Sequence, residues 1–235
     1  MNLTDFRVLS FDCYGTLIDW ESGILTALGP VLGRASVGQN NEAILAAFAA
    51  AEVAIQTASP AMRYSAVLEA VHARLASAWN VPVDPAENAR FGASIGDWPA
   101  FPDTVAALRL LQNRYRLVIL SNIGRASFNA TNQTLGVTFD AIYTAEDIGS
   151  YKPDIRNFEY LIDRLAADGV QKGEILHVAQ SLFHDHAPAN AIGLASVWID
   201  RRHGMTGWGA TVPPPGGIRY DYRFLSLGDL AAAIG

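Results

Sequence analysis

Residues 6–17 read Phe6-Arg-Val-Leu-Ser-Phe-Asp12-Cys-Tyr14-Gly-Thr16-Leu, an apolar β pattern that breaks into a glycine-containing turn directly after a carboxylate. In an open α/β sheet, a carboxylate at the carboxyl end of a buried parallel strand points into the crevice where ligands bind. From there it can attack a carbon or phosphorus centre and form a covalent intermediate. Asp12 is therefore a candidate nucleophile, and the alternative is that it only caps the helix that follows.

Strand and helix patterns alternate over most of the chain, which is typical of an α/β fold whose parallel sheet is covered on both faces. The first strand is expected at Phe6–Phe11. After Pro102 the predicted helices are Asp103–Asn113, Ala126–Leu135, Ile155–Ala167 and Ala187–Ile192, and the predicted strands are Arg116–Leu120, Ala141–Tyr143, Ile175–Val178 and Ser196–Ile199. A last short helix is expected after Ser226, which has Asp229 at capping-box spacing.

Residues 21–97 interrupt the alternation, because they contain helical patterns only: Ser22–Leu32, Glu42–Gln56, Met62–Trp79 and Pro85–Ile95. The segment is typical of a helical insertion. Its apolar stripes have helical spacing and are expected to form a core of their own.

Composition argues against several functional classes. The net charge is −6, so neither nucleic acid nor an anionic membrane surface is expected as a partner. The one basic cluster, Arg201-Arg202-His203, is interpreted as a solvated turn or at most as local help for an anionic ligand. Neither a long apolar run nor a secretion signal is seen, so we expect no membrane span. The single cysteine, Cys13, excludes an intramolecular disulfide, and the cytoplasm is the simplest expected location.

Polar residues follow four of the predicted strands or the loops behind them: Asp12, Ser121 with Asn122, Lys152, and Asp185. Because parallel strands all end on the same edge of a sheet, these side chains are expected to converge there. Each has a simpler explanation by itself, either as a helix N-cap or, for Lys152, as an exposed loop lysine. Their shared position favours a site.

The order of these motifs resembles the haloacid dehalogenase superfamily: Asp12-Cys-Tyr-Gly-Thr16, then Leu120-Ser-Asn122, then Ser150-Tyr-Lys152-Pro153, then an acidic loop that ends in Asp185. The resemblance covers the whole chain. It implies a hydrolase with a Rossmann-like core, residues 1–20 and 98–235, and a helical cap over the site, residues 21–97. Exposed cap faces offer a surface for a homodimer, by analogy with the fold alone.

Tyr14 separates two chemistries within the superfamily, because the phosphatases carry a second aspartate at this position. A phenol is a poor Mg²⁺ ligand and, with a pKa of about 10, a weak acid for an alkoxide leaving group. Tyrosine here resembles the type II 2-haloacid dehalogenases, which act on carbon through an aspartyl ester. We therefore expect no metal and no other cofactor. A Mg²⁺-dependent phosphatase and a non-catalytic binding protein are the alternatives.

Two departures from those dehalogenases bear on the substrate. Their halide-binding cap arginine has no counterpart in Ala46–Ala54, and the fourth motif reads Gln180-Ser-Leu-Phe-His184-Asp-His186. Together with Trp198-Ile-Asp-Arg-Arg-His-Gly204, the motifs are more similar to L-azetidine-2-carboxylate hydrolase, which opens a strained ring beside a carboxylate. A haloacid and an azetidine stay open as substrates, and both are small carboxylates displaced at C2.

The resemblance implies a role for each residue of the main motifs. Asp12 would attack C2, while Lys152 and Thr16 would stabilise it and the oxyanion of ester hydrolysis. Asp185 would orient Lys152 or activate water. Ser121 and Asn122 would hold the substrate carboxylate.

Three further side chains would surround C2 and the leaving group. Tyr14 would form part of an apolar wall. His184 and His186 would matter for an azetidine, because a ring amine needs a proton to leave and an imidazole can give one near neutral pH. For a haloacid, the two histidines would only bond the cap.

Overall fold

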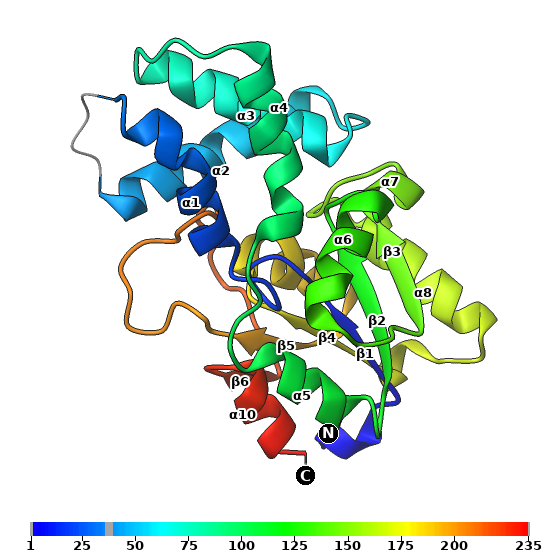
Figure 1. Ribbon diagram of the computed structural model, residues 1–235. Helices are drawn as coiled ribbons and strands as arrows, with labels where there is room; N and C mark the ends of the chain where they lie inside the picture. Colours follow the sequence, from blue (N-terminus) through cyan, green and yellow to red (C-terminus); the bar gives the residue numbers. More distant parts are fainter. Residues whose placement is uncertain (1, 36–39, 235) are drawn as a thin grey trace.

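The computed structural model describes residues 2–35 and 40–234 and confirms the α/β fold. Six parallel strands form one sheet in the order β3-β2-β1-β4-β5-β6 (Figure 1). The strands are Val8–Phe11 (β1), Arg116–Ser121 (β2), Ala141–Thr144 (β3), Ile175–Ala179 (β4), Ala195–Ile199 (β5) and Tyr222–Phe224 (β6). Since β1 pairs with both β2 and β4, the turn after it lies at the middle of the sheet's carboxyl edge.

Helices and short turns connect the strands. The helices are Thr104–Leu111 (α5), Arg125–Leu135 (α6), Ala145–Ile148 (α7), Arg156–Ala167 (α8), Ala187–Ile192 (α9) and Leu227–Ala232 (α10), with 3₁₀ turns at Leu3–Asp5, Ser94–Asp97 and Lys172–Glu174 and a π-helical turn at Leu182–His186. The predicted elements end within two residues of the observed ones. The sequence patterns missed β6, α7 and the π-helical turn.

Each face of the sheet has its own apolar core, because side chains alternate along a strand. On one face, Val8 of β1 and Val118 and Leu120 of β2 pack against α8. On the other face, Leu9 and Phe11 belong to a core that includes residues of α5, α6 and α10. Both faces are therefore covered, and the carboxyl edge is what the sheet offers to a ligand.

Four helices pack together beyond that edge: Trp20–Leu32 (α1), Asn41–Ala58 (α2), Tyr64–Ala78 (α3) and Pro85–Ala93 (α4) (Figure 1). The expected apolar stripe of α3 is buried: Val67, Leu68, Val71 and Leu75. The division into a core of residues 1–20 and 98–235 and a cap of residues 21–97 stays a prediction.

The interpretation of Arg201-Arg202-His203 as a solvated turn was wrong for both arginines. The Arg202 guanidinium is largely buried and makes ion pairs with Glu21 of α1 and Glu42 of α2. Arg201 donates hydrogen bonds to the carbonyl oxygen of Thr16 at 3.0 and 3.2 Å. Through these ion pairs and hydrogen bonds, the loop after β5 connects α1 and α2 to the sheet.

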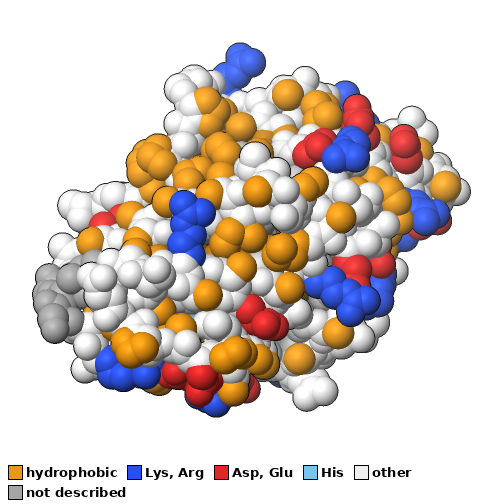
Figure 2. Space-filling model, turned by 90° about the horizontal axis from the view of Figure 1, so that it is seen from above, with side chains coloured by type: hydrophobic (Ala, Val, Ile, Leu, Met, Phe, Trp, Pro, Cys, Tyr) orange, Lys and Arg blue, Asp and Glu red, His pale blue; other side chains and the backbone are white. Residues whose placement is uncertain are grey.

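Seen from above, the surface carries acidic and basic side chains close to one another, with apolar ones between them (Figure 2). In the described part of the chain, every helix is too short or too polar to span a membrane.

Candidate active site

A cavity lies between the carboxyl edge of the sheet and the first turns of helices α1 and α3. Its lining includes Asp12, Lys152 and Asp185 from the sheet side and Trp20, Glu52 and Tyr64 from α1, α2 and α3. The cavity is narrow, with a volume of about 30 Å³.

Asp12 lies at the end of β1 with a donor on each carboxyl oxygen. Thr16 Oγ1 donates to Oδ2 at 2.7 Å, and Lys152 Nζ donates to Oδ1 at 2.9 Å. Thr16 is itself held, because the backbone N–H of Gln180 donates to its hydroxyl at 2.9 Å. Gly15 allows this turn, since its φ is +93° and a Cβ there would lie 2.9 Å from the Trp20 ring. The loop therefore aims the carboxylate at the cavity.

Lys152 is buried and surrounded by three acceptors, one for each of its ammonium hydrogens. Its Nζ lies 2.9 Å from Asp12 Oδ1, 2.6 Å from Asp185 Oδ1 and 3.0 Å from the carbonyl oxygen of Leu120. The ammonium thus joins the two carboxylates and cannot rotate freely.

Two residues that the sequence patterns missed extend this network. His177 Nε2 lies 3.0 Å from Asp185 Oδ1, and His177 Nδ1 lies 2.9 Å from Ser10 Oγ. Strand register explains the second contact, because Ser10 and His177 are paired on β1 and β4. The sequence feature that could have indicated this contact is a histidine and a serine that each lie inside an otherwise apolar strand.

The charges of the network follow from its burial and its ion pairs. Burial raises the pKa of Asp12, against the opposing effect of Lys152. For Asp185, burial is outweighed by Lys152 and His177, which lower its pKa. Burial also works against the Lys152 ammonium, but Asp12 and Asp185 raise the pKa of Lys152 overall. Lys152 is therefore charged at neutral pH, with Asp185 as its ionised partner.

Ser121 and Asn122 both line the cavity but use their side chains differently. Asn122 Oδ1 accepts from the backbone N–H of Lys152 at 2.6 Å, and its Nδ2 donates to the Lys152 carbonyl at 3.0 Å. The Ser121 hydroxyl makes no hydrogen bond within the described residues, so it is free for a ligand. Substrate binding by either residue stays a prediction. Asn122 has one amide hydrogen left that could be donated to a substrate.

The two histidines of the fourth motif lie in different surroundings. His184 lines the cavity, with Nδ1 3.2 Å from Ser181 Oγ. His186 is fully buried and uses both ring nitrogens, with Ser196 Oγ at 2.9 Å and the Ala179 carbonyl at 3.0 Å. Burial lowers the pKa of each imidazole to about 4. Both ring nitrogens of His186 therefore have protein partners, which favours its structural role and leaves His184 as the imidazole at the cavity.

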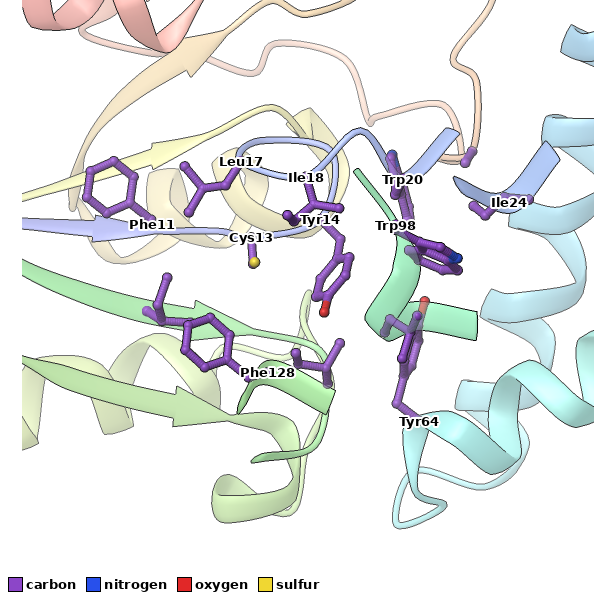
Figure 3. Close-up of a cluster of buried hydrophobic side chains, with 14 of the residues drawn as sticks. Phe11, Cys13, Tyr14, Leu17, Ile18, Trp20, Ile24, Tyr64, Trp98 and Phe128 are labelled. Atoms are coloured by element: carbon purple, nitrogen blue, oxygen red, sulfur yellow. The ribbon is translucent and has the colours of Figure 1, made fainter. Parts of the chain in front are cut away.

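Tyr14 presents its ring to the cavity and its hydroxyl to the protein interior. The hydroxyl lies 2.5 Å from Thr131 Oγ1, and the ring meets Trp98 edge to face at 5.7 Å between centroids. Figure 3 shows this ring among Trp20, Trp98 and Tyr64. These aromatic side chains form an apolar wall.

Glu52 was missed, although it is the one charged residue in Ala46–Ala54. It lies on α2, is 3% exposed and lines the cavity. The Tyr64 hydroxyl donates to its Oε1 at 2.5 Å. The sequence feature that could have indicated its burial is that Glu52 is a single charged residue within an alanine-rich helical segment.

The residues at this edge do not fit a Mg²⁺ ion. Lys152 Nζ lies between Asp12 and Asp185, where a cation held by both carboxylates would lie. Tyr14, at the position two residues after Asp12, turns its hydroxyl to Thr131. Within residues 2–35 and 40–234, no three His, Cys, Asp or Glu side chains are grouped as metal ligands.

Known proteins share the sequence pattern and the fold. A curated (S)-2-haloacid dehalogenase of Pseudomonas fluorescens is 32% identical over 107 residues, which span 44% of this chain and 45% of that relative, less than half its length. A crystal structure of a defluorinating L-2-haloacid dehalogenase is 22% identical, with a TM-score of 0.79 over 98% of this chain and 97% of that one.

A second solved structure is an L-2-haloacid dehalogenase from Xanthobacter autotrophicus with chloropropionic acid covalently bound. It is 19% identical, with a TM-score of 0.75 over 97% of this chain and 98% of that one. The family model described as haloacid dehalogenase-like hydrolase matches residues 6–192, which include Asp12, Lys152 and Asp185. With most of its length matched in this way, the chain belongs to the haloacid dehalogenase-like hydrolase family.

Proposed function

We propose that this protein displaces the leaving group at C2 of a small carboxylate through an ester on Asp12. The observation that carries the proposal is the pair of donors, Thr16 and Lys152, that hold the Asp12 carboxylate at the cavity. The Xanthobacter relative, whose structure has chloropropionic acid covalently bound, supports the same kind of chemistry.

In the first step, Asp12 attacks C2 from the side opposite the leaving group, so the product has inverted configuration. Ser121, with its free hydroxyl at the cavity, binds the substrate carboxylate. The aromatic wall around Tyr14 excludes water from the attack on C2, so water reacts only after the ester has formed.

In the second step, water attacks the carboxyl carbon of Asp12. Lys152 and Thr16 each donate to an oxygen of that group, and one such preorganised donor is worth about 3 kcal/mol. Asp185 contributes to this step through Lys152, because its Oδ1 accepts from the lysine ammonium at 2.6 Å and its own pKa, lowered by Lys152 and His177, makes it a weak base. Asp185 thus orients the Lys152 ammonium toward the oxygens of the Asp12 carboxyl group.

Two leaving groups fit this mechanism, a halide and the nitrogen of a strained ring as in L-azetidine-2-carboxylate. The cavity lining contains one cationic side chain, Lys152, among the described residues, and two carboxylates already hold it. The azetidine is therefore a substrate to test beside L-2-chloropropionate.

The test is a single turnover in ¹⁸O-labelled water with enzyme in excess. We expect unlabelled oxygen in the hydroxyacid product and label in the Asp12 peptide, because product oxygen comes from the carboxylate. Label in the first product molecules would rule out the ester. Activity on p-nitrophenyl phosphate that a chelator removes and Mg²⁺ restores would favour a phosphatase instead.

A further inference from the structure

Glu52 and Tyr64 form a polar pair on the side of the cavity that faces away from the sheet. Both side chains are buried and line the cavity, and the Tyr64 hydroxyl donates to Glu52 Oε1. Glu52 Oε2 has no hydrogen-bond partner in the part of the chain that the structure describes. A carboxyl group that is 97% buried therefore keeps one oxygen for a ligand in the cavity.

The pair lacks a positive partner. No lysine, arginine or histidine forms an ion pair with Glu52 in the described ranges. The other titratable groups that influence the pair are Tyr151 and Tyr14, both phenols. A buried carboxylate without a cation is costly, and burial raises the pKa of Glu52 to about 7. A carboxyl group with a shifted pKa that lines a cavity is a candidate functional group.

We infer that Glu52 and Tyr64 bind a positively charged nitrogen attached to C2, so that the substrate is a strained cyclic amino acid and the leaving group is its ring amine. This inference rests on the proposed function. It also gives a reason why the segment that would carry a halide-binding arginine carries a glutamate here: a carboxylate attracts an ammonium and repels a departing halide.

The chemistry balances without another reactant. The ring nitrogen enters as a secondary ammonium with two hydrogens, paired with the Glu52 carboxylate. As the bond from Asp12 to C2 forms, the bond from C2 to nitrogen breaks and its electron pair stays on nitrogen. The nitrogen becomes the neutral primary amine of the opened chain, which then takes a proton from solvent. Glu52 keeps the nitrogen protonated before the attack, and this is what makes it a leaving group.

Ligand binding to the Asp12→Asn protein tests the inference without turnover. The two ligands are L-azetidine-2-carboxylate and cyclobutanecarboxylate, which has the same ring size and no nitrogen. We expect the azetidine to bind more tightly, and Glu52→Gln in the same background to reduce that preference by at least about 30-fold, because a buried ionic partner is lost. Glu159→Gln, at an exposed glutamate of α8, is the matched control.

The pH dependence of azetidine binding is a second readout. Burial raises the pKa of Glu52 to about 7, and pairing needs the carboxylate, so affinity should rise with pH up to about 7 and then level off. His184, with a pKa lowered to about 4, titrates outside this range. Glu52→Gln should make azetidine binding independent of pH in this range. Tyr64→Phe, a milder change, should weaken azetidine binding but leave its pH dependence in place.

Equal binding of the two ligands by the parent protein, or an unchanged preference in Glu52→Gln, would overturn the inference. If Glu52→Gln does not fold, Tyr64→Phe is the test, and an unchanged preference for the azetidine in that variant would overturn the inference. Failure of the proposed function is seen separately, as the absence of an Asp12 ester in mass spectra of the wild-type protein with any C2-substituted acid.

Discussion

Asn122 holds the backbone of Lys152 from both sides, accepting from its N–H at 2.6 Å and donating to its carbonyl at 3.0 Å. This two-way contact fixes the start of the lysine side chain, whose far end is fixed by Asp12 and Asp185. The lysine is therefore positioned at both ends, which a long flexible side chain needs if its ammonium is to act as a preorganised donor.

Asn122→Ala should lower kcat more than it raises KM. The change leaves two backbone groups of Lys152 unpaired, at a cost of about 1–3 kcal/mol, and the ammonium loses its fixed position. Steady-state kinetics on the best substrate provide the measurement. A large rise in KM at constant kcat would instead favour the sequence-based prediction that Asn122 binds the substrate carboxylate.

Lys152→Met should destabilise the protein at neutral pH by about 3–5 kcal/mol, because two buried carboxylates lose their shared cation. Adding Asp185→Asn should recover part of that loss but no activity, since the ammonium is still missing. Urea unfolding measures both effects. Lys172→Met, at an exposed lysine, is the control and should cost about 1 kcal/mol or less. A Lys152→Met protein as stable as wild type would show that the carboxylates are not coupled through the lysine.

The parts of the site that could be predicted from the sequence are those at strand ends. Asp12, Lys152 and Asp185 follow breaks in apolar patterns, and the geometry of parallel strands brings such positions together. His177 and Glu52 could not be placed in the same way, because each lies inside a regular element. Their partners, Ser10 and Tyr64, are distant in sequence or come from another helix, so only strand register and helix packing reveal them.

The same limit applies to the fold. Helix and strand positions follow from periodicity, which is local. The three-residue strand β6 has no such pattern, and it forms because β5 offers it a hydrogen-bonding edge. The ion pairs of Arg202 with Glu21 and Glu42 likewise depend on where the loop after β5 meets α1 and α2.

Acid should destabilise the protein between pH 6.5 and 4 through His184 and His186. Burial lowers both pKa values from 6.5 to about 4, so in this range the unfolded chain binds protons that the folded protein does not. Stability is fully present above pH 6.5 and is lost as pH falls toward 4, by about 3 kcal/mol for each histidine.

His186→Gln should therefore show a smaller loss of unfolding free energy between pH 6.5 and 4 than wild type, by about 3 kcal/mol. Urea unfolding at several pH values measures this slope. His203→Gln, at an exposed histidine, should keep the wild-type slope. An unchanged slope in His186→Gln would mean that this imidazole is not held neutral by burial.

Glu52 should act in the opposite direction. Burial raises its pKa from 4.5 to about 7, so the folded protein binds a proton that the unfolded chain has released. The stability that this proton contributes is fully present below pH 4.5 and is lost as pH rises through about 7. Over that range the loss is about 3 kcal/mol.

Glu52→Gln cannot ionise and can still accept a hydrogen bond from Tyr64. Its unfolding free energy relative to wild type should therefore increase by about 3 kcal/mol between pH 4.5 and 8, whereas Glu159→Gln should show no such increase. A constant difference across this range would mean that the Glu52 carboxyl is not desolvated. If Glu52→Gln is more stable than wild type at pH 8 and no longer prefers the azetidine, the two roles of the residue are separated. The ionised carboxylate then lowers the stability of the empty protein and raises its affinity for a cationic ligand.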